Sequence, residues 1–316
     1  MQFIDAEEVK ARLPFEVTIP LMREAMSAFS GKRTRQLLRS IMPLAGENMF
    51  GVMPGALAAD GPFGAKLISV VPHNFDSGGP SHQGVIVLFD GKSGAPISVI
   101  DAGEVTALRT AAASAMATDV LARPDARRLA LFGYGRQAEE HARAIGKIRS
   151  LEALTVWGRD ASRAADFARR MEDELGLACD VAPTARDAAA KADILCTVTP
   201  ATEPILEGGW LNAGAHVNLV GAGHAGQTEA DNGLVARSRF FVDSREGVIA
   251  QGGEFRRAKA AGAVDDDHIA GEIGEVILGV REGRRSADEV TVYKSLGHVA
   301  QDLACAWALY SGGEGA

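Results

Sequence analysis

The most constraining feature of this sequence is a glycine-rich turn that joins a strand pattern to a helix pattern. The apolar run RLALF at 128–132 leads into Gly133-Tyr134-Gly135-Arg136-Gln137-Ala138, and a helix pattern begins near Gln137. The first glycine allows a tight turn, the second allows a pyrophosphate to approach the backbone, and Ala138 permits close packing of helix on strand. The N–H groups of the helix N-terminus favour an anion there. The turn therefore predicts a dinucleotide-binding βαβ unit.

The segments that follow this turn alternate between strand and helix patterns. The predicted strands are ALTVWG at 153–158, ADILCTVTP at 192–200, AHVNLVGAG at 215–223 and RFFVDS at 239–244. Two helix patterns flank the first of these strands. RQAEEHARAIGKI at 136–148 precedes ALTVWG, and SRAADFARRMEDEL at 162–175 follows it. Alternation at this spacing requires helical crossovers between parallel strands. We therefore predict an α/β fold, a Rossmann doubly wound parallel sheet, over residues 123–297.

The region before this domain has a different texture. Short β-like runs separated by turns occupy residues 39–99, which predicts a mixed or antiparallel sheet. Two helices precede these runs, and a small-residue helix over 104–122 follows them and ends before Pro124. The segment KSLGHVAQDLACAWALY at 294–310 is predicted to form a helix that returns to this region. We therefore predict a second, α+β domain made of residues 1–122 together with 298–316.

Composition excludes several classes of protein. The 316 residues are 47% hydrophobic and carry a formal net charge of -8 with no basic run, which argues against a nucleic-acid partner. No apolar stretch approaches the ~20 residues that a membrane helix needs. The N-terminal stretch MQFIDAEEVKARL lacks the apolar centre of a signal peptide. We therefore expect a cytoplasmic protein with no membrane partner.

The sequence offers no metal site. Its three cysteines, Cys179, Cys196 and Cys305, are scattered and odd in number, so they indicate neither a disulfide framework nor a zinc site. The run Asp265-Asp266-Asp267-His268 is interpreted as a solvated turn and helix start. No cluster of His, Asp and Glu has the spacing of a ligand set, so no metal cofactor is expected.

The end of the second Rossmann strand, Trp157-Gly158-Arg159-Asp160, bears on the choice of dinucleotide. NAD enzymes usually place Asp or Glu there to hold the ribose 2′-hydroxyl. Gly158 occupies that position, and the guanidinium of Arg159 suits a 2′-phosphate, although it could equally be a solvated loop arginine. We therefore favour NADP(H) as the cofactor, with NAD(H) as the alternative.

Several segments together resemble the ornithine cyclodeaminase/mu-crystallin family over almost the whole chain. They are RSIMP, GAKLISVVPHN, PSHQGVIVLFDGKSGAP, TALRTAAASAMAT, FGYGRQAEEH, VDSREG and YKSLGHVAQDL. An arginine within a small-residue helix, followed by GxGxQA and later by KSxG, is a specific combination. The resemblance implies a homodimer in which the first domain and the last helix form the substrate pocket and the dimer interface.

The resemblance also implies roles for individual residues. Arg39 and Lys66 match positions that bind the substrate carboxylate, Arg109 matches one that contacts substrate and cofactor, and Leu296 matches a substrate contact. Lys66 and Arg109 are the implied catalytic residues. With the motif residues, the predicted cofactor-binding set is Ser81, Arg109, Gly133, Gly135, Arg136, Gln137, Arg159, Thr199 and Ser295.

The chemistry of the three cations agrees with these roles. A guanidinium binds a planar carboxylate through two parallel hydrogen bonds, and a lysine can add charge or shuttle a proton. Taken without the family, Arg39 and Lys66 would more often be surface charges. Arg109 differs, because an arginine among alanines on a packed helix needs a buried partner, and a ligand anion could be one. His73 and His82 are interpreted as structurally satisfied histidines.

One position departs from the cyclodeaminase pattern. Members that deaminate place an aspartate in the loop after the strand that corresponds to AHVNLV, and aligning GQTE puts Gly223 at that position, with His224 offset by one. Deamination with water needs a positioned base, which glycine cannot supply. Reduction of a preformed imine needs only a carboxylate clamp and a nicotinamide held against the C=N carbon. Members without the aspartate behave as ketimine reductases.

We therefore predict an NAD(P)H-dependent reductase that converts a small α-imino acid into the L-amino acid. The substrate is either a cyclic ketimine such as Δ1-pyrroline-2-carboxylate or an acyclic imino acid such as iminosuccinate. One alternative is an ornithine cyclodeaminase or amino-acid dehydrogenase in which His224 or Lys66 replaces the aspartate. A second alternative, from another class, is a non-catalytic protein that binds NADP and a small ligand.

Overall fold

The computed structural model describes residues 1–75 and 79–312, and the chain forms two compact units. The first comprises Met1–Arg109 with His298–Ala316, of which residues 313–316 are not described, and the second comprises Thr110–Gly297. The predicted division followed residue 122. The structure places it inside helix α3 (Ala102–Leu121), so the small-residue helix continues from one unit into the other.

The first unit is built on a mixed sheet with the order β1-β7-β6-β5-β4-β2, in which β3 also pairs with β4. The strands β4 to β7 pair antiparallel, whereas β1 runs parallel to β7. The strands are β1 (Gln2–Ile4), β2 (Arg35–Gln36), β3 (Ser40–Pro43), β4 (Met49–Ala56), β5 (Phe63–Val70), β6 (His82–Phe89) and β7 (Pro96–Asp101). Besides α3, the helices are α1 (Ala6–Arg12), α2 (Phe15–Ser30) and α11 (Val299–Ser311), with a 3-10 turn at Pro72–Phe75.

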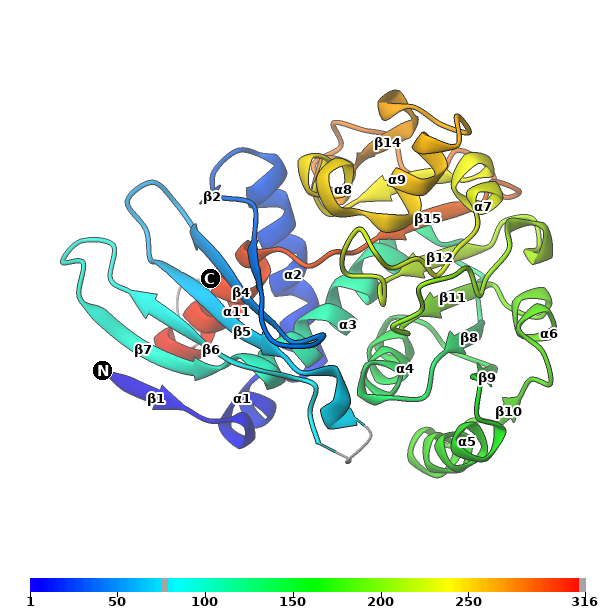
Figure 1. Ribbon diagram of the computed structural model, residues 1–316, viewed down its shortest axis with the longest axis horizontal. Coiled ribbons are helices and arrows are strands. Elements are labelled where there is room, and N and C mark those ends of the chain that lie inside the picture. Colours follow the sequence, from blue (N-terminus) through cyan, green and yellow to red (C-terminus); the bar gives the residue numbers. More distant parts are fainter. Residues whose placement is uncertain (76–78, 313–316) are drawn as a thin grey trace. The chain divides into compact units, whose positions relative to one another are not determined.

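Helices α2 and α11 pack together, and α11 lies along β4, β5 and β6 (Figure 1). His298 caps the start of α11 by accepting a hydrogen bond from the N–H of Ala300 to its side chain, and Gly312 caps the end in the left-handed conformation. On β5, Gly64 and Lys66 are buried, whereas the residue between them is only half-buried, as the two-residue period of a strand requires. A side-chain atom of Leu303 would lie 3.3 Å from a Cβ at Gly64. The buried face of β5 therefore faces α11.

The second unit is a Rossmann fold, as predicted. Its sheet has the order β10-β9-β8-β11-β12-β15-β13-β14, and its strand pairs are parallel. The strands are β8 (Arg128–Phe132), β9 (Ala153–Trp157), β10 (Cys179–Val181), β11 (Ile194–Thr197), β12 (His216–Leu219), β13 (Arg239–Val242), β14 (Ile269–Glu272) and β15 (Thr291–Lys294). The helices are α4 (Arg136–Ile148), α5 (Ala161–Leu175), α6 (Ala185–Ala190), α7 (Asn232–Arg237), α8 (Arg245–Gln251), α9 (Gly253–Ala260) and α10 (Ile273–Ile277), with 3-10 turns at Gly208–Trp210 and Asp266–His268.

Strand β8 lies at the point where the strand order reverses. From β8 the chain proceeds to β9 and β10 on one side and then returns to β11 on the other side. In open α/β sheets, ligands bind outside the carboxyl ends of the strands at this switch point. The glycine-rich turn directly follows β8, so the fold places the turn where a nucleotide is expected.

One predicted element is wrong. The segment 294–310 was expected to be a single helix, but Lys294 is the last residue of β15 and α11 begins only at Val299. The residues between them turn the chain, with Gly297 in the left-handed conformation at φ 81°. The four residues of β15 lie between β12 and β13 and are completely buried. The segment is short, and Thr and Lys flank its two apolar residues, so its sequence does not look like a central strand.

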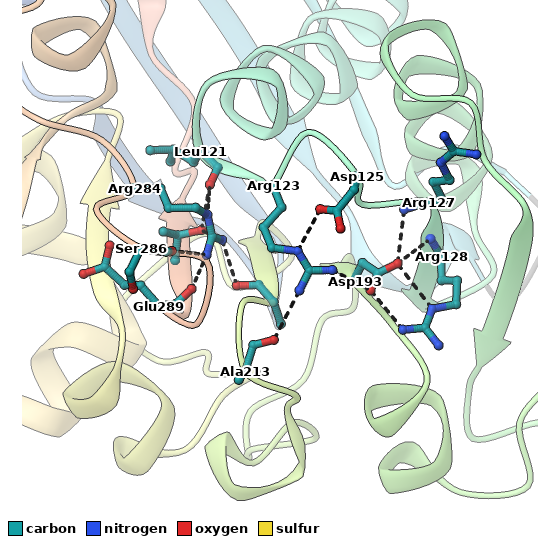
Figure 2. A network of polar contacts seen from close by, with 12 residues as sticks. Leu121, Arg123, Asp125, Arg127, Arg128, Asp193, Ala213, Arg284, Ser286 and Glu289 are labelled. Atoms are coloured by element: carbon teal, nitrogen blue, oxygen red, sulfur yellow. Dashed lines mark hydrogen bonds and ion pairs between the residues drawn. The ribbon is translucent and has the colours of Figure 1, made fainter.

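Arginines and one aspartate hold the amino ends of the Rossmann strands (Figure 2). The carboxylate of Asp193, just before β11, accepts hydrogen bonds from the N–H groups of Arg127 and Arg128 and from the guanidinium of Arg128. The guanidinium of Arg284 donates to the carbonyl oxygens of Leu121, Ala215 and Glu289. These contacts join the starts of β8 and β11 to the loops beside them.

No helix in the described part of the chain combines the length and the apolar character needed to cross a membrane. Among residues 1–75 and 79–312, no three His, Cys, Asp or Glu side chains are grouped so that they could hold a metal ion.

Candidate active site

The glycine-rich turn has the geometry that a phosphate-binding turn requires. Gly133 adopts φ 119°, which L side chains rarely adopt, and its N–H donates to the carbonyl oxygen of Trp157 at 2.9 Å. A Cβ at this position would lie 3.1 to 3.3 Å from atoms of Val198 and Thr199. Gly135 is the N-cap of α4 and offers no side chain to the first N–H groups of that helix. The turn therefore leaves the helix N-terminus open to an anion.

Two of the predicted cofactor contacts have buried polar atoms with nothing to bind. The Oε1 atom of Gln137 and the Oγ atom of Ser295 are buried, and neither has a hydrogen-bond partner in the described part of the chain. Buried polar atoms in native proteins are nearly always hydrogen-bonded. Their positions, after β8 and after β15, both lie at the carboxyl edge of the sheet. These residues therefore fit a polar ligand such as a nicotinamide dinucleotide.

A buried carboxylate, Glu229, organises the loops after β11 and β12. Its Oε1 accepts hydrogen bonds from the N–H and the hydroxyl of Thr199 at 2.6 and 2.8 Å. Its Oε2 accepts from the hydroxyl of Thr197 at 2.7 Å and from the N–H groups of Gly221 and Ala222 at 2.7 and 3.2 Å. The hydroxyl hydrogen of Thr199, a predicted cofactor contact, is thus already directed at Glu229.

A buried ion pair, Lys294 with Glu254, lies beside Glu229. The ammonium of Lys294 on β15 lies 2.9 Å from the Glu254 carboxylate on α9, and both side chains are fully buried. Lys294 also donates to the carbonyl oxygen of Ala222 at 2.7 Å, and the N–H of Glu229 donates to Glu254 at 3.2 Å. Burial raises the pKa of Glu229. The negative charge of Glu254 raises this pKa further, whereas the positive charge of Lys294 lowers it. The loop that contains Gly223 is therefore supported by the buried side chains of Glu229, Lys294 and Glu254.

The turn after β15 is fixed by Asp243, which is buried at the end of β13. Its Oδ2 accepts hydrogen bonds from the N–H groups of Leu296 and Gly297 at 2.7 and 2.8 Å. Leu296, the predicted substrate contact, is half-buried and packs against the core of this unit. Asp243 therefore fixes the backbone of Leu296 and Gly297, the two residues after Ser295.

In the first unit, the two predicted catalytic cations meet at one carboxylate. The ammonium of Lys66 lies 2.9 Å from each oxygen of Asp302, and the Nε of Arg109 lies 3.0 Å from Oδ1 of the same group. The Nη1 of Arg109 donates to Oε1 of Gln301 at 3.0 Å. The exposed fractions are 2% for Lys66, 4% for Arg109 and 0% for Asp302. The cluster contains two positive charges and one negative charge.

Burial lowers the pKa of Lys66 to about 8. The Asp302 carboxylate opposes this shift, whereas the charges of Arg109 and Arg39 add to it. Arg39 is half-buried between β2 and β3, and it is near enough to act on Lys66 through its charge. The structure therefore brings Lys66 and Arg109 into one cluster and places Arg39 within electrostatic range.

The other predicted residues of the first unit lie on or near β6. The hydroxyl of Ser81 lies 2.9 Å from Nδ1 of His82, at the start of the strand. His82 is exposed at the start of β6, and His73 is exposed on the 3-10 turn that follows β5. Neither histidine contacts Lys66 or Arg109 directly.

The end of β9 shows what replaces the acidic residue of NAD enzymes. A Cβ at Gly158 would lie 2.2 and 2.4 Å from ring atoms of Tyr134, so the tyrosine ring covers this glycine. The guanidinium of Arg163 lies 5.4 Å from the centre of the same ring, within range of a cation–π interaction. Arg159 and Arg163 are both exposed. Of the remaining predicted contacts, Arg136 begins α4 with its side chain 53% exposed.

The loop that distinguishes cyclodeaminases has room at its key position. A Cβ at Gly223 would meet no atom within 4 Å. The N–H of Gly223 donates to Gln227, and Nδ1 of His224 accepts from the N–H of Gly226. The loop therefore presents no carboxylate at this position, although it could accommodate one.

Sequence reasoning missed Asp302, Gln301 and Glu229. A usable signal existed for the first two, because Asp302 is an acidic residue within the apolar helix VAQDLACAWAL and Arg109 needed a buried partner. Glu229 stands in the segment GQTEAD, which has the composition of an ordinary polar loop. Only the fold shows that five donors converge on it.

Comparison with known proteins gives full-length matches. The ornithine cyclodeaminase/mu-crystallin family model matches residues 2–315. Ketimine reductase mu-crystallin from Mus musculus is 34% identical over 313 residues, which cover 98% of this chain and 96% of that protein.

Two solved structures show the same agreement. Δ1-pyrroline-2-carboxylate reductase from Thermococcus litoralis, in complex with NADH and L-proline, has a TM-score of 0.95 at 31% identity, covering 98% of this chain and 97% of that one. The iminosuccinate reductase of Paracoccus denitrificans, in complex with NAD+, has a TM-score of 0.89 at 28% identity, covering 98% and 95%. With its two units and its glycine-rich turn, this chain belongs to the ornithine cyclodeaminase/mu-crystallin family.

Proposed function

We propose that this protein is an NAD(P)H-dependent reductase that converts a small α-imino acid into the L-amino acid. The buried cluster of Lys66, Arg109 and Asp302 carries the proposal, because two cations share one carboxylate and so leave one positive charge uncompensated. A buried charge without a partner is strongly unfavourable. The carboxylate of a bound imino acid would complete the cluster.

The second unit has the groups that a dinucleotide needs. The open N-terminus of α4 would hold the pyrophosphate, and the unsatisfied polar atoms of Gln137 and Ser295 would bind other polar groups of the cofactor. When bound, the reduced nicotinamide supplies a hydride to the carbon of the C=N bond and is itself oxidised. The protein's part is to orient the substrate carboxylate and to exclude water.

Gly223 supports reduction over deamination. Water attack on an imine needs a base, and this position carries only hydrogen. The α-imino acid can bind as an iminium ion that already carries the electrophilic charge, so hydride transfer asks for no such base. The same three relatives, a ketimine reductase, a Δ1-pyrroline-2-carboxylate reductase and an iminosuccinate reductase, support C=N reduction as the reaction type.

NADPH is the preferred cofactor in this proposal. Arg159 and Arg163 are exposed beside Tyr134 at the end of β9, where a 2′-phosphate would meet two guanidinium groups. An acidic residue at Gly158 would collide with the Tyr134 ring, so changing that glycine alone is a poor test of cofactor choice. Replacing both Arg159 and Arg163 with uncharged residues tests the cofactor preference without a collision with Tyr134. The NADPH preference should then fall, whereas NADH binding should change little.

The first unit is also proposed to form a homodimer, as the family resemblance implies. Large apolar side chains are exposed along one segment of it, namely Leu37, Leu38, Ile41, Met42 and Leu44. Several large apolar side chains exposed on one short segment are typical of a protein contact. Light scattering should give twice the mass of one chain, and Met42→Glu with Leu44→Glu should shift the protein towards the monomer.

The central experiment is an assay of NADPH and NADH oxidation with a panel of imino acids. The panel contains cyclic ketimines and acyclic imines formed from keto acids with ammonia. Arg109→Met and Lys66→Met should each lower kcat/KM by about 100-fold or more, because the buried carboxylate of the substrate loses charged donors. Arg33→Met and Lys92→Met remove exposed cations of the same unit and should have little effect.

The alternatives predict different results. Ammonia and proline formed from ornithine at ordinary enzymatic rates would show a cyclodeaminase, with His224, Lys66 or water as its base. Oxidation of an L-amino acid by NAD(P)+ with a kcat/KM above that for reduction of every imino acid in the panel would show a dehydrogenase. Tight binding of NADPH and an imino acid without any turnover would show a binding protein, and near-normal turnover of both Met variants would place the pocket elsewhere.

A further inference from the structure

Asp302 contacts both proposed catalytic cations. It stands on α11, whereas Lys66 comes from β5 and Arg109 from α3, so the carboxylate joins three elements that are far apart in the sequence. Its side chain is completely buried. An aspartate in this position fixes the direction of both cations at once.

The donors left over on the two cations point to a ligand. A guanidinium has five N–H donors, and the Nε and Nη1 groups of Arg109 are engaged by Asp302 and Gln301. Within residues 1–75 and 79–312, the Nη2 group of Arg109 has no hydrogen-bond partner. The Lys66 ammonium binds Asp302 and, at 3.4 Å, the hydroxyl of Thr106. The Lys66 ammonium therefore keeps one of its three N–H donors, and Arg109 keeps one end of its guanidinium, for an anion.

We propose that Asp302 is the positioning residue of the substrate clamp, which orients Lys66 and Arg109 so that their remaining donors converge on one substrate carboxylate. The inference rests on the proposed function and extends it by giving the last helix of the chain a role in substrate binding. Gln301, one residue before Asp302, adds a second anchor for Arg109. The clamp thus has two layers, with the cations facing the ligand and α11 holding the cations.

A purely structural ion cluster would be expected to balance its charges. Buried ion pairs are tolerated when each charge is compensated, and one uncompensated charge makes such a cluster destabilising. The titratable groups whose charges act within this cluster are Lys66, Arg109 and Asp302 themselves, with Arg39, His82, His298 and Cys305 around them. Asp302 is the acid in this set that is hydrogen-bonded to both cations, so its removal changes the charge and the geometry together.

The test combines a binding measurement with a titration, so that it does not depend on turnover. Pyrrole-2-carboxylate serves as the probe, because it is a planar carboxylate that hydride cannot reduce. Asp302→Asn should weaken its binding by about 10- to 100-fold. In protein labelled with 13C-lysine, the same variant should lower the pKa of Lys66 by roughly 1 to 3 units from about 8, because the carboxylate that favours the charged lysine is gone.

Two further variants separate positioning from packing. Asp302→Glu keeps the charge and should return the Lys66 titration towards that of the unmodified protein. Leu303→Ala removes a buried apolar side chain from the same helix and should lower the Tm while leaving probe affinity and the Lys66 titration unchanged. If Asp302→Asn does not fold, Gln301→Met should still raise the Kd of the probe several-fold, because Arg109 loses one anchor.

The outcomes are distinct. Unchanged probe binding and an unchanged Lys66 titration in Asp302→Asn would overturn the inference. Unchanged probe binding in Gln301→Met would overturn it if Asp302→Asn is unfolded. Weakened probe binding together with failure of the unmodified protein to reduce any imino acid would leave the clamp standing and reject the reductase.

Discussion

The polar groups that hold the two edges of the Rossmann sheet differ in how deeply they are buried. At the amino edge, the guanidinium of Arg284 donates to three backbone carbonyl oxygens, and Asp193 accepts from backbone N–H groups and from Arg128 (Figure 2). At the carboxyl edge, the fully buried Glu229 accepts five hydrogen bonds, one from the last residue of β11 and four from the loops after β11 and β12. At the amino edge the side chain of Arg128 is half exposed to solvent, whereas at the carboxyl edge Glu229 is completely buried.

The difference appears in the pKa values of the two acids. Burial alone would raise the pKa of Asp193, but hydrogen bonds from the Arg128 side chain and from the N–H groups of Arg127 and Arg128 reverse this and lower it. For Glu229, burial and Glu254 outweigh Lys294 and the hydrogen bonds, so its pKa is raised. A lowered acid pKa adds stability at neutral pH, whereas a raised one subtracts from it. The raised pKa of Glu229 therefore lowers stability at the edge where we propose that the cofactor binds.

The strongest test of this contrast is at the turn itself. Gly133→Val introduces a side chain at φ 119° and forces Cβ within 3.1 to 3.3 Å of Val198 and Thr199. We expect NADPH affinity to fall by about 100-fold or more, measured by fluorescence titration, because the strain and the new bulk move the backbone away from the phosphates. Gly146→Ala lies on α4, the helix that follows the turn, has open space around the added methyl group and should bind NADPH normally. Normal NADPH binding by Gly133→Val would show that the pyrophosphate lies elsewhere.

A smaller loss is expected from Glu229→Gln. The amide keeps one acceptor oxygen, but its NH2 group must face N–H or hydroxyl donors of Thr199 or Gly221, and those donors lose their partner. We expect kcat/KM to fall by about 30-fold through loosening of the two loops, with a rise in the Km for the cofactor. Glu203→Gln, which removes an exposed carboxylate in the same unit, is the control. A Glu229→Gln variant that loses stability but keeps full activity would mean that the loops do not position the cofactor.

Much of the fold followed from local pattern. The run RLALF, the glycine turn and the alternating segments identified the Rossmann unit, because period and turn chemistry are local properties. The strand β15 was missed, because its burial depends on β12 and β13 on either side of it rather than on its own four residues. The division inside α3 was also missed, since a continuous helix carries no signal of where its neighbours change.

The sequence alone identifies a candidate site residue when a local motif defines the role of that residue. Gly133 and Gly135 follow from a motif, whereas Arg39 and Lys66 were singled out only through the family resemblance. The partners of the cations were invisible, because Asp302 lies 236 residues from Lys66 and 193 from Arg109. Glu229 was invisible for a related reason, since its donors come from two different loops that only the sheet brings together.

At the amino edge, loss of a side chain should affect stability and leave catalysis alone. Arg284→Met leaves the carbonyl oxygens of Leu121, Ala215 and Glu289 without their donor. We expect a loss of about 2 kcal/mol in the free energy of unfolding, since water can replace part of what is lost. The exposed neighbour Arg285 pairs with Glu289 at the surface, so Arg285→Met should cost about 0.5 kcal/mol or less. A fall in kcat/KM larger than a few-fold in Arg284→Met would show that the two edges are coupled.

The smallest effect concerns the pH dependence of stability at Asp193. Its pKa is lower in the folded protein than in the unfolded chain, so its contribution is fully present above the ordinary aspartate pKa and is lost as the pH falls through the folded value. Asp193→Asn should therefore unfold at a lower Tm at neutral pH, with a loss of about 1 kcal/mol, and the two melting curves should converge in strong acid. Asp125→Asn, which alters an exposed partner of Arg123, should leave the pH dependence unchanged. A constant difference between Asp193→Asn and the unmodified protein at all pH values would mean that Asp193 acts through its shape and not through its charge, and the contrast between the two edges would then lose its electrostatic basis.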